Sequence, residues 1–389
     1  MTQLKLSEAS GRLARPDSDV WRVHYDALDR LEKGDDILLL SVGDPDFDTP
    51  REITDEVIRA IHAGRTHYSP AAGELSLRRA IAHLEYRGTG TEFTADDVVI
   101  FPGATAALFA VFASILDPGS AVVVPEPMYV GYQSIFTTLG AEVRTVPLTQ
   151  PRFELDVDEL VDRIDANTRA VLINTPGNPL GNIIPEPSLR RLASACRERG
   201  VWLLCDEVYS LITFETPHRS LLKCTNDISN IGIIDGLSKS HAMSGWRVGW
   251  LVGAPELVAA ATRFSGAALF GVSQFIQDAA VWALENDAED VERMRRAYQA
   301  RRDYAVDRLR SIKGLDCFVP EAGMFVMIDS SRVANSGEDF ADRLLDLAGI
   351  STIPGAAFGP SASNYVRLSL TVDEAGLGNA FDRIEGMLT

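Results

Sequence analysis

The sequence predicts an α/β fold, in which a large domain with a mostly parallel seven-stranded sheet is joined to a smaller α+β domain. Three observations predict it. The chain has 389 residues, 46% of them hydrophobic, which is enough to bury at least one large core. Short apolar runs alternate with helical patterns, as in parallel strands joined by crossover helices. After about residue 311 this alternation gives way to a different strand pattern.

Seven short apolar runs are the predicted strands of the large domain. They are Val98–Phe101, Ala121–Val124, Val143–Val146, Ala170–Asn174, Val201–Cys205, Ile231–Asp235 and Val248–Val252. The segments between and after them carry helical patterns, with predicted helices at Ala104–Leu116, Pro187–Arg199, Pro255–Ser265 and Ser273–Glu285. Parallel strands need such crossover segments, so the order favours a parallel sheet.

The C-terminal part of the chain is predicted to form the smaller domain. A charged, arginine-rich stretch from Ala288 to about Ser311 predicts one long exposed helix. The strands expected after it are Cys317–Val319, Met324–Ile328 and Tyr365–Leu370. The first forty or so residues are expected to pack with this unit as an N-terminal arm. We therefore place the large domain at residues 40–286 and the small domain at residues 1–39 and 287–389.

Composition limits the classes of partner. The chain has 37 basic and 55 acidic residues, a net charge of −18, and no basic patch stands out, which argues against nucleic acid and anionic membrane. Cysteines 196, 205, 224 and 317 lack CxxC spacing and are expected to be reduced thiols of a cytoplasmic protein. The polar N-terminus indicates no signal peptide, and no apolar run approaches membrane-spanning length.

The most informative segment is Ser238-Lys239-Ser240, which is followed by Arg247 eight residues after the lysine. It comes just after the predicted strand Ile231–Asp235, so Lys239 is expected at a strand end, where an α/β sheet holds its ligands. A lysine there can form a Schiff base with a carbonyl cofactor, and an arginine can bind that cofactor's phosphate. The alternative is a surface lysine in a Gly/Ser loop.

Three other predicted strands are followed by polar or turn residues. Pro102-Gly103-Ala104-Thr105 opens a helix, whose free N–H groups can bind phosphate. Thr175-Pro176-Gly177-Asn178 is a rigid loop that presents Asn178, although it also suits a plain turn. Asp206 ends an apolar strand, where a carboxylate is costly without a partner, and Tyr209 follows it. A protonated pyridine nitrogen would be such a partner and would keep Asp206 ionised.

Together these segments resemble the cofactor site of the fold-type I aminotransferases of class I and II, which use pyridoxal 5′-phosphate. The resemblance runs from Leu39-Leu40-Ser41-Val42-Gly43-Asp44-Pro45-Asp46-Phe47 to Tyr365-Val366-Arg367-Leu368. It implies a homodimer with active sites at the subunit interface, and amino-acid and 2-oxo-acid substrates. It implies no metal.

The resemblance also assigns roles to individual residues. Its catalytic residues are Lys239, which carries the cofactor, Asp206 at the ring nitrogen, and Tyr209, which with Asn178 contacts the ring hydroxyl. Further cofactor contacts are Gly103, Ala104, Thr105, Ser238 and Arg247 around the phosphate, Tyr129 stacked on the ring, and Tyr68 reaching the phosphate of the neighbouring subunit. The substrate contacts are Arg367 on the α-carboxylate, assisted by Gly43 and Asn178. Arginine offers the flat two-pronged donor that fits a carboxylate.

Two positions depart from the family pattern. Many relatives have a phosphate-binding serine three residues before the lysine, where this chain has Gly236, and a threonine where it has Leu180. The first change is expected to weaken the grip on the cofactor phosphate. Neither removes a residue that the chemistry requires.

The implied reaction is transamination with ping-pong kinetics. An amino acid leaves its amine on the cofactor and departs as a 2-oxo acid, and a second oxo acid then takes the amine. Two alternatives remain open. A lyase or oxidase can use the same scaffold, and a non-catalytic ligand sensor can use the same fold.

The amino donor is the least determined property. Within the family the chain most resembles the bacterial arginine:pyruvate transaminases, in segments such as Glu126-Pro127-Met128-Tyr129 and Ala357-Phe358-Gly359-Pro360. In that resemblance an acid stands where this chain has Arg22, and a Pro-Glu pair where it has Ser273-Gln274. A guanidinium needs a carboxylate partner, so losing two acids argues against arginine. Arginine is the first choice, with aspartate, aromatic and aliphatic donors as alternatives.

Overall fold

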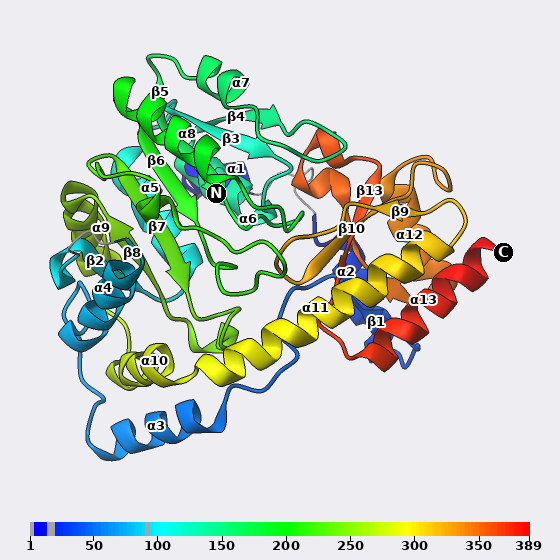
Figure 1. Cartoon of the computed structure of the whole chain (residues 1–389), viewed down its shortest axis with the longest axis horizontal. Helices are drawn as coiled ribbons and strands as arrows, with labels where there is room; N and C mark the ends of the chain where they lie inside the picture. Colours follow the sequence, from blue (N-terminus) through cyan, green and yellow to red (C-terminus); the bar gives the residue numbers. More distant parts are fainter. Residues whose placement is uncertain (1–3, 14–19, 90–92) are drawn as a thin grey trace.

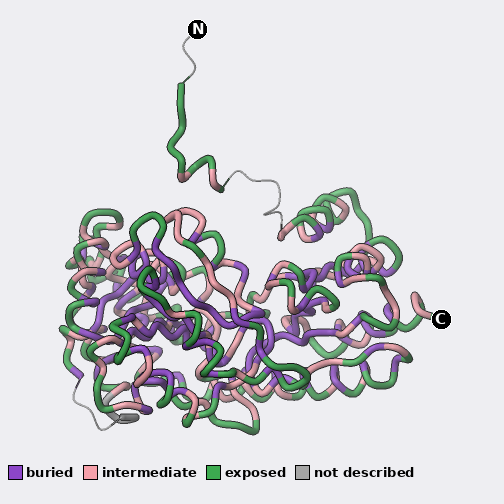
Figure 2. The backbone as a smooth tube through the Cα atoms, turned by 90° about the horizontal axis from the view of Figure 1, so that it is seen from above, coloured by how far each residue is buried: buried purple, intermediate pink, exposed green. Residues whose placement is uncertain are grey.

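The computed structural model describes residues 4–13, 20–89 and 93–389. Parts of the predicted N-terminal arm, residues 1–3 and 14–19, lie outside the described residues. Figure 1 shows two bodies side by side, a larger one around a wide sheet and a smaller one around a narrow sheet, with a long helix running between them. Buried backbone runs through both bodies and exposed positions cover their outside (Figure 2).

The larger body contains a seven-stranded sheet in the order β2-β8-β7-β6-β5-β3-β4. Its strands are β2 (Val98–Phe101), β3 (Ala121–Glu126), β4 (Glu142–Pro147), β5 (Thr168–Asn174), β6 (Trp202–Asp206), β7 (Ile231–Gly236) and β8 (Gly249–Gly253). Strand β8 runs antiparallel to its neighbours β2 and β7, and the other pairings are parallel. The predicted mostly parallel seven-stranded sheet is therefore confirmed.

Helices cover both faces of this sheet, because successive side chains of a strand point to opposite faces. In β2, Val98 and Ile100 pack into one core cluster, and Val99 and Phe101 pack into the other. The first face is covered by α3 (Arg51–His62), α4 (Leu75–Thr89), α7 (Val157–Asp162), α8 (Glu186–Glu198) and α10 (Gln274–Asn286). The second is covered by α5 (Ala104–Ile115), α6 (Val130–Leu139) and α9 (Pro255–Ala268). The four predicted helices of this region correspond to α5, α8, α9 and α10.

The smaller body is built on a four-stranded antiparallel sheet in the order β12-β13-β10-β9. Its strands are β9 (Asp316–Cys317), β10 (Phe325–Asp329), β12 (Ile353–Pro354) and β13 (Tyr365–Ser369), and a parallel pair, β1 (Leu38–Leu39) and β11 (Ile350–Ser351), lies beside it. Helices α2 (Arg22–Glu32), α12 (Gly337–Ala348) and α13 (Glu374–Leu388) share its core. Strands β1, β11 and β12 were not predicted, because two residues are too few to show a period.

Helix α11 (Ala288–Ser311) has the predicted bounds, but the prediction that it is exposed is wrong along one side. Arg301 and Arg302 are buried, at 6% and 3% exposure. Arg301 binds both carboxylate oxygens of Asp46, at 2.7 and 2.8 Å, and Arg302 lies over the ring of Phe214 at 4.6 Å. A guanidinium can be buried when it is paired and stacked, so an arginine-rich sequence does not by itself indicate exposure.

One short N-terminal helix and several 3₁₀ turns lie outside these sheets and their covering helices. Helix α1 (Glu8–Leu13) lies against α6, where Arg12 donates to the carbonyl oxygens of Thr137 and Thr138 at 2.8 Å. Short 3₁₀ turns occur at η2 (Ala95–Asp97), η3 (Leu221–Lys223), η4 (Ser244–Trp246), η5 (Gly355–Phe358) and η6 (Pro360–Ala362). In the described part of the chain, no helix combines the length and apolarity needed to cross a bilayer. The domain boundaries at residues 39/40 and 286/287 remain a prediction.

Candidate active site

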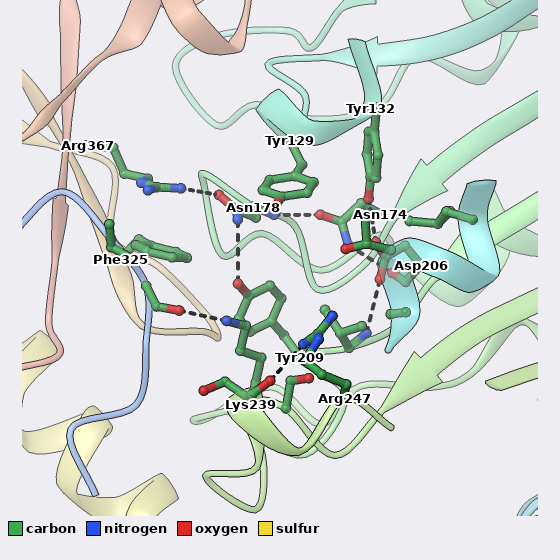
Figure 3. A pocket seen from close by; sticks show the side chains of 18 of the residues that line it. Tyr129, Tyr132, Asn174, Asn178, Asp206, Tyr209, Lys239, Arg247, Phe325 and Arg367 are labelled. Carbon is green, nitrogen blue, oxygen red and sulfur yellow. Dashed lines mark hydrogen bonds between the residues drawn. The ribbon is translucent and has the colours of Figure 1, made fainter. Parts of the chain in front are cut away.

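One cavity lies where the carboxyl ends of the central strands of the large sheet face the smaller body (Figure 3). It is lined from both bodies. From the larger body come Ala104, Thr105, Leu108, Tyr129, Tyr132, Asn174, Asn178, Asp206, Val208, Tyr209, Ser238, Lys239, Ser244 and Arg247, and the other lining residues are Trp21, Val42, Gly43, Phe325 and Arg367. Residues far apart in the sequence therefore meet at a strand-end edge, where parallel sheets hold ligands.

Lys239 lies in the loop that follows β7. Its Nζ donates a hydrogen bond to the backbone oxygen of Gly43 at 2.6 Å, and the described residues give it no ion-pair partner. Burial lowers the pKa of Lys239 to about 8, with Arg367 and Arg247 adding to the decrease and Asp44 opposing it. An amine with that pKa is partly unprotonated near neutral pH, which is the form that attacks a carbonyl.

Asp206 is the last residue of β6 and is 5% exposed. Its Oδ2 accepts a hydrogen bond from the Tyr132 hydroxyl at 2.6 Å, and its Oδ1 accepts from the Val208 N–H at 3.3 Å. Burial raises the pKa of Asp206 to about 6, and these two hydrogen bonds oppose the increase. No basic side chain of the described residues pairs with it, so this buried carboxylate is suited to a cation on a ligand.

Arg367 projects from β13 and is 2% exposed. Its guanidinium carbon lies 4.0 Å from the ring centroid of Phe325 and 4.9 Å from that of Phe358. Nη1 donates to Asn178 Oδ1 at 2.9 Å and Nη2 donates to the Ser41 oxygen at 2.7 Å, while Nε has no partner. Burial lowers the pKa of Arg367 to about 10. A buried guanidinium without a carboxylate partner is suited to an anionic ligand.

Asn178 links the guanidinium of Arg367 to Tyr209. Besides accepting from Arg367, it donates through Nδ2 to the Tyr209 hydroxyl at 3.4 Å. Its own backbone N–H donates to Asn174 Oδ1 at 2.7 Å, and Asn174 Nδ2 donates to the Asp206 backbone oxygen at 2.9 Å. The ends of β5 and β6 are thereby joined, and the Asn178 side chain is held at the cavity.

A third basic group, Arg247, lies at the N-terminus of α5. Gly103 caps this helix with φ +90°, and a Cβ there would lie 2.3 Å from Nη2 of Arg247. Arg247 itself has φ +57°, and its Nη1 donates to the Ser244 oxygen at 2.7 Å. The cavity is lined by Ala104, Thr105, Ser238 and Arg247, whereas Gly103, next to the Arg247 guanidinium, does not line it. The free N–H groups of the helix and the guanidinium together suit a phosphate.

Tyr129 and Tyr68 occupy different places. The Tyr129 ring lines the cavity and meets the Tyr132 ring edge to face, with centroids 5.3 Å apart. Tyr68 is 80% exposed and does not line the cavity, and its ring packs against that of Phe270 at 5.0 Å. Every predicted site residue except Gly103 and Tyr68 therefore lines one cavity.

The sequence interpretation did not include Tyr132, Asn174, Ser244 and Phe325 among the site residues. Tyr132 could have been found, because it lies in the first turn of α6, three residues after Tyr129, which immediately precedes that helix. Phe325 could not have been found in this way, because an aromatic residue in a predicted strand is expected to pack in the hydrophobic core.

The two positions that depart from the family pattern, Gly236 and Leu180, are both closely packed in the structure. A Cβ at Gly236 would lie 2.8 Å from the Val248 oxygen and 3.0 Å from the Gly249 Cα, so β8 leaves no room for a side chain there. Leu180 is buried in a cluster with Val130 and Phe358.

The cavity fits the cofactor that the resemblance implies, pyridoxal phosphate. Asp206 would hold the protonated ring nitrogen, Tyr209 and Asn178 the ring hydroxyl, and Arg247 with the start of α5 the phosphate. Lys239 offers an amine with a lowered pKa for the carbonyl carbon. Each chemical group of the cofactor has a complementary side chain.

Comparisons with known proteins agree with this assignment. The profile of the family described as aminotransferase class I and II matches residues 35–384. An arginine–pyruvate transaminase of Pseudomonas aeruginosa is 42% identical over 98% of this chain and 97% of its own. A probable aspartate/prephenate aminotransferase of Aquifex aeolicus is 33% identical over 92% of each. Among solved structures, the aspartate aminotransferase of Thermus thermophilus with maleate superimposes with a TM-score of 0.94 at 31% identity, over 99% of this chain and 100% of the other.

Proposed function

Because the chain belongs to the class I and II aminotransferases, and is thus a pyridoxal-phosphate enzyme of fold type I, we propose that it transfers the α-amino group of arginine to pyruvate or a similar small 2-oxo acid. The observation that carries the site assignment is the meeting, in one cavity, of three charged groups that have no ion-pair partner among the described residues. They are Lys239, Asp206 and Arg367. Each one matches a different group of cofactor or substrate.

Pyridoxal phosphate, when bound, supplies the electron sink for the α-carbon. The residues of this chain orient the groups and move the protons. Arg367 binds the α-carboxylate through its unpartnered N–H groups and so directs the α-carbon toward Lys239. The Lys239 amine takes the α-proton and later returns a proton on the same face. Asp206, held by Tyr132, keeps a proton on the ring nitrogen.

Other residues hold the cofactor in place. Arg247 and the first residues of α5 bind the phosphate, and Ser238 contributes its hydroxyl. Tyr129 stacks on the ring, supported by the edge of Tyr132. Asn178 and Tyr209 bind the ring hydroxyl. Because Asn178 also touches Arg367, it ties the position of the ring to that of the substrate carboxylate.

Arginine remains the first choice of donor, supported by the 42% identical relative named for arginine and pyruvate. The sequence argued against arginine because Arg22 stands where the arginine:pyruvate transaminases have an acid. In the structure Arg22 does not line the cavity, and its guanidinium pairs with Asp342 at 2.7 Å, so this argument is weakened. Gln274 is likewise engaged with Glu74 at 2.8 Å. Asp44, which accepts from Ser244 at 2.5 Å, is an acidic residue near Lys239, but it does not line the cavity either.

A donor screen tests the choice. Arginine, aspartate, phenylalanine and leucine are each supplied with pyruvate, and alanine formation is measured. We expect the highest kcat/KM with arginine. A tenfold advantage for aspartate or phenylalanine, about 1.4 kcal/mol of transition-state discrimination, would make the arginine assignment wrong while leaving the reaction class intact.

We also propose a homodimer with active sites at the subunit interface. The support is the exposed aromatic pair Tyr68 and Phe270, at 80% and 64% exposure. Phe270 has φ +58°, an uncommon backbone conformation for a bulky residue, which suggests a site with a function. Sedimentation with and without cofactor tests the dimer, and a fully active monomer would contradict it.

A cytoplasmic location is proposed from the four free cysteines.

A further inference from the structure

The orientation of the Arg367 guanidinium depends on the backbone oxygen of Ser41, in the segment after β1 that lies beside the end of β13, where the Ser369 N–H donates to the Leu40 oxygen at 2.8 Å. The rings of Phe325 and Phe358 confine the guanidinium to a plane, at 4.0 and 4.9 Å. They do not fix its rotation within that plane. The hydrogen bonds to Asn178 Oδ1 and to the Ser41 oxygen do, at 2.9 and 2.7 Å. The position of Ser41 therefore decides where the remaining N–H groups of Arg367 point.

Ser41 is held through its side chain, in addition to the backbone hydrogen bonds that join its neighbour Leu40 to Ser351 and Ser369 at 3.0 and 2.8 Å. It is fully buried, and its Oγ accepts a hydrogen bond from the Ser351 hydroxyl at 2.8 Å. The same Oγ lies 2.8 Å from His24 Nδ1. Since Ser351 is the donor in the first bond, the Ser41 hydroxyl proton is free for Nδ1, which accepts it only when unprotonated. Burial lowers the pKa of His24, in agreement with a neutral ring.

His24 also touches the wall of the cavity. It lies in the first turn of α2, and Trp21, the residue that precedes this helix, lines the cavity. The Trp21 and His24 rings meet edge to face with centroids 5.9 Å apart. The start of α2 and the residue before it thus carry both a wall of the cavity and the imidazole that contacts Ser41.

We propose that His24 is a positioning residue for carboxylate binding. Its unprotonated Nδ1 accepts from Ser41, which sets the backbone oxygen that orients Arg367. The proposal rests on the proposed function of Arg367 as the α-carboxylate clamp. His24 touches neither substrate nor cofactor in this scheme. Its effect is confined to ligands that carry a carboxylate.

The test compares two small probes of the holoenzyme. Propionate has a carboxylate and no amine, and propylamine has an amine and no carboxylate. For His24→Phe we expect propionate to bind about tenfold more weakly as a competitive inhibitor, with propylamine binding, the visible cofactor spectrum and kcat all within twofold of the unaltered enzyme. For His24→Asn we expect propionate affinity within threefold, because an amide oxygen can accept from Ser41.

Two further variants guard against misfolding and unspecific effects. Ser41→Ala removes the same bond from its other end and keeps the backbone oxygen, so it should reproduce the propionate loss. Leu31→Ala alters an exposed residue further along α2, at 43% exposure, and should leave both probes unchanged. Unchanged propionate affinity in His24→Phe and Ser41→Ala, equal losses of both probes, or no recovery in His24→Asn would each overturn the proposal.

Arg367→Ala separates this inference from the function on which it rests. If Arg367→Ala still binds propionate normally, the clamp assignment itself is wrong. If Arg367→Ala loses propionate while His24→Phe keeps it, the clamp stands and the positioning role of His24 is wrong.

Discussion

The two sides of the cavity are built in different ways. On the side proposed to hold the cofactor, Asp206 ends β6, and Asn178 and Lys239 follow the ends of its neighbours β5 and β7, so each is placed by its own strand. On the substrate side, Arg367 depends on Phe325, Phe358 and Ser41, which come from separate segments. Figure 3 shows Arg367 and Phe325 on one side of the cavity and Asp206 and Tyr132 on the other.

This difference predicts which substitutions should affect only the altered residue and which should also disturb its neighbours. A substitution on the cofactor side removes a group whose neighbours are held by the sheet. A substitution on the substrate side disturbs contacts between segments and is expected to act on binding before chemistry.

The largest effect is expected for Lys239→Ala. This variant loses the covalent anchor and the amine that moves the α-proton, so turnover should fall by at least roughly 10⁴-fold. The visible absorbance of the covalently attached cofactor should disappear. Absorption spectra and steady-state rates measure both. Lys313→Ala, at an exposed position, is the control, and a Lys239→Ala enzyme that keeps absorbance and turnover would contradict the assignment.

Asp206→Asn should separate activity from stability. An amide cannot hold the ring nitrogen protonated, so kcat should fall by roughly 10²–10³-fold. The raised pKa of about 6, against 3.8 ordinarily, means that the folded apoenzyme loses stability as the pH rises from about 4 to about 6. At pH 7 the apoenzyme variant should therefore be more stable by about 3 kcal/mol, at 1.36 kcal/mol per pKa unit.

Denaturant unfolding of both apoenzymes at pH 7 and pH 3.5 measures this gain. It should be present at pH 7 and absent at pH 3.5, below both pKa values. A variant that is less stable than the unaltered apoenzyme at pH 7 would show that Asp206 has a cationic partner in the folded chain.

Arg367→Ala should act on substrate binding. Losing a charge-assisted hydrogen bond costs about 1.5–3 kcal/mol, so KM should rise roughly 10- to 100-fold for every amino acid and oxo acid. The visible absorbance of the covalently attached cofactor should remain, because Lys239 is unaltered. Arg22→Ala removes a guanidinium that pairs with Asp342 outside the cavity and should leave KM within about twofold. A rise in KM for one substrate only would indicate that Arg367 binds the side chain of that substrate instead of the α-carboxylate.

Gly236→Ser should have the smallest effect on the reaction. It introduces the residue that many relatives have, yet the new Cβ would lie 2.8 Å from the Val248 oxygen. We expect no gain in cofactor affinity and a stability loss of about 1–3 kcal/mol from overpacking. Cofactor titration and thermal unfolding measure the two quantities. Tighter cofactor binding would show that β8 can shift to admit the hydroxyl.

The sequence by itself determined the cofactor side. Apolar runs predicted each strand of the large sheet to within two residues at its ends, and a polar residue after a strand end must lie at the ligand-binding edge. Asp206, Asn178 and Lys239 could therefore be placed with no knowledge of tertiary packing, and Arg247 through its spacing of eight residues from Lys239. The same local reasoning failed for the buried arginines of α11, since pairing with Asp46 and stacking on Phe214 are long-range events.

Only the tertiary structure decided the substrate side. The partners of Arg367 come from β10, from η5 and from the segment after β1, and two-residue strands such as β1 and β11 leave no period in the sequence. The links from His24 to Ser41 and from Tyr132 to Asp206 join residues 17 and 74 positions apart. Such contacts depend on how elements pack against each other, whereas strand-end placement depends only on the strand itself.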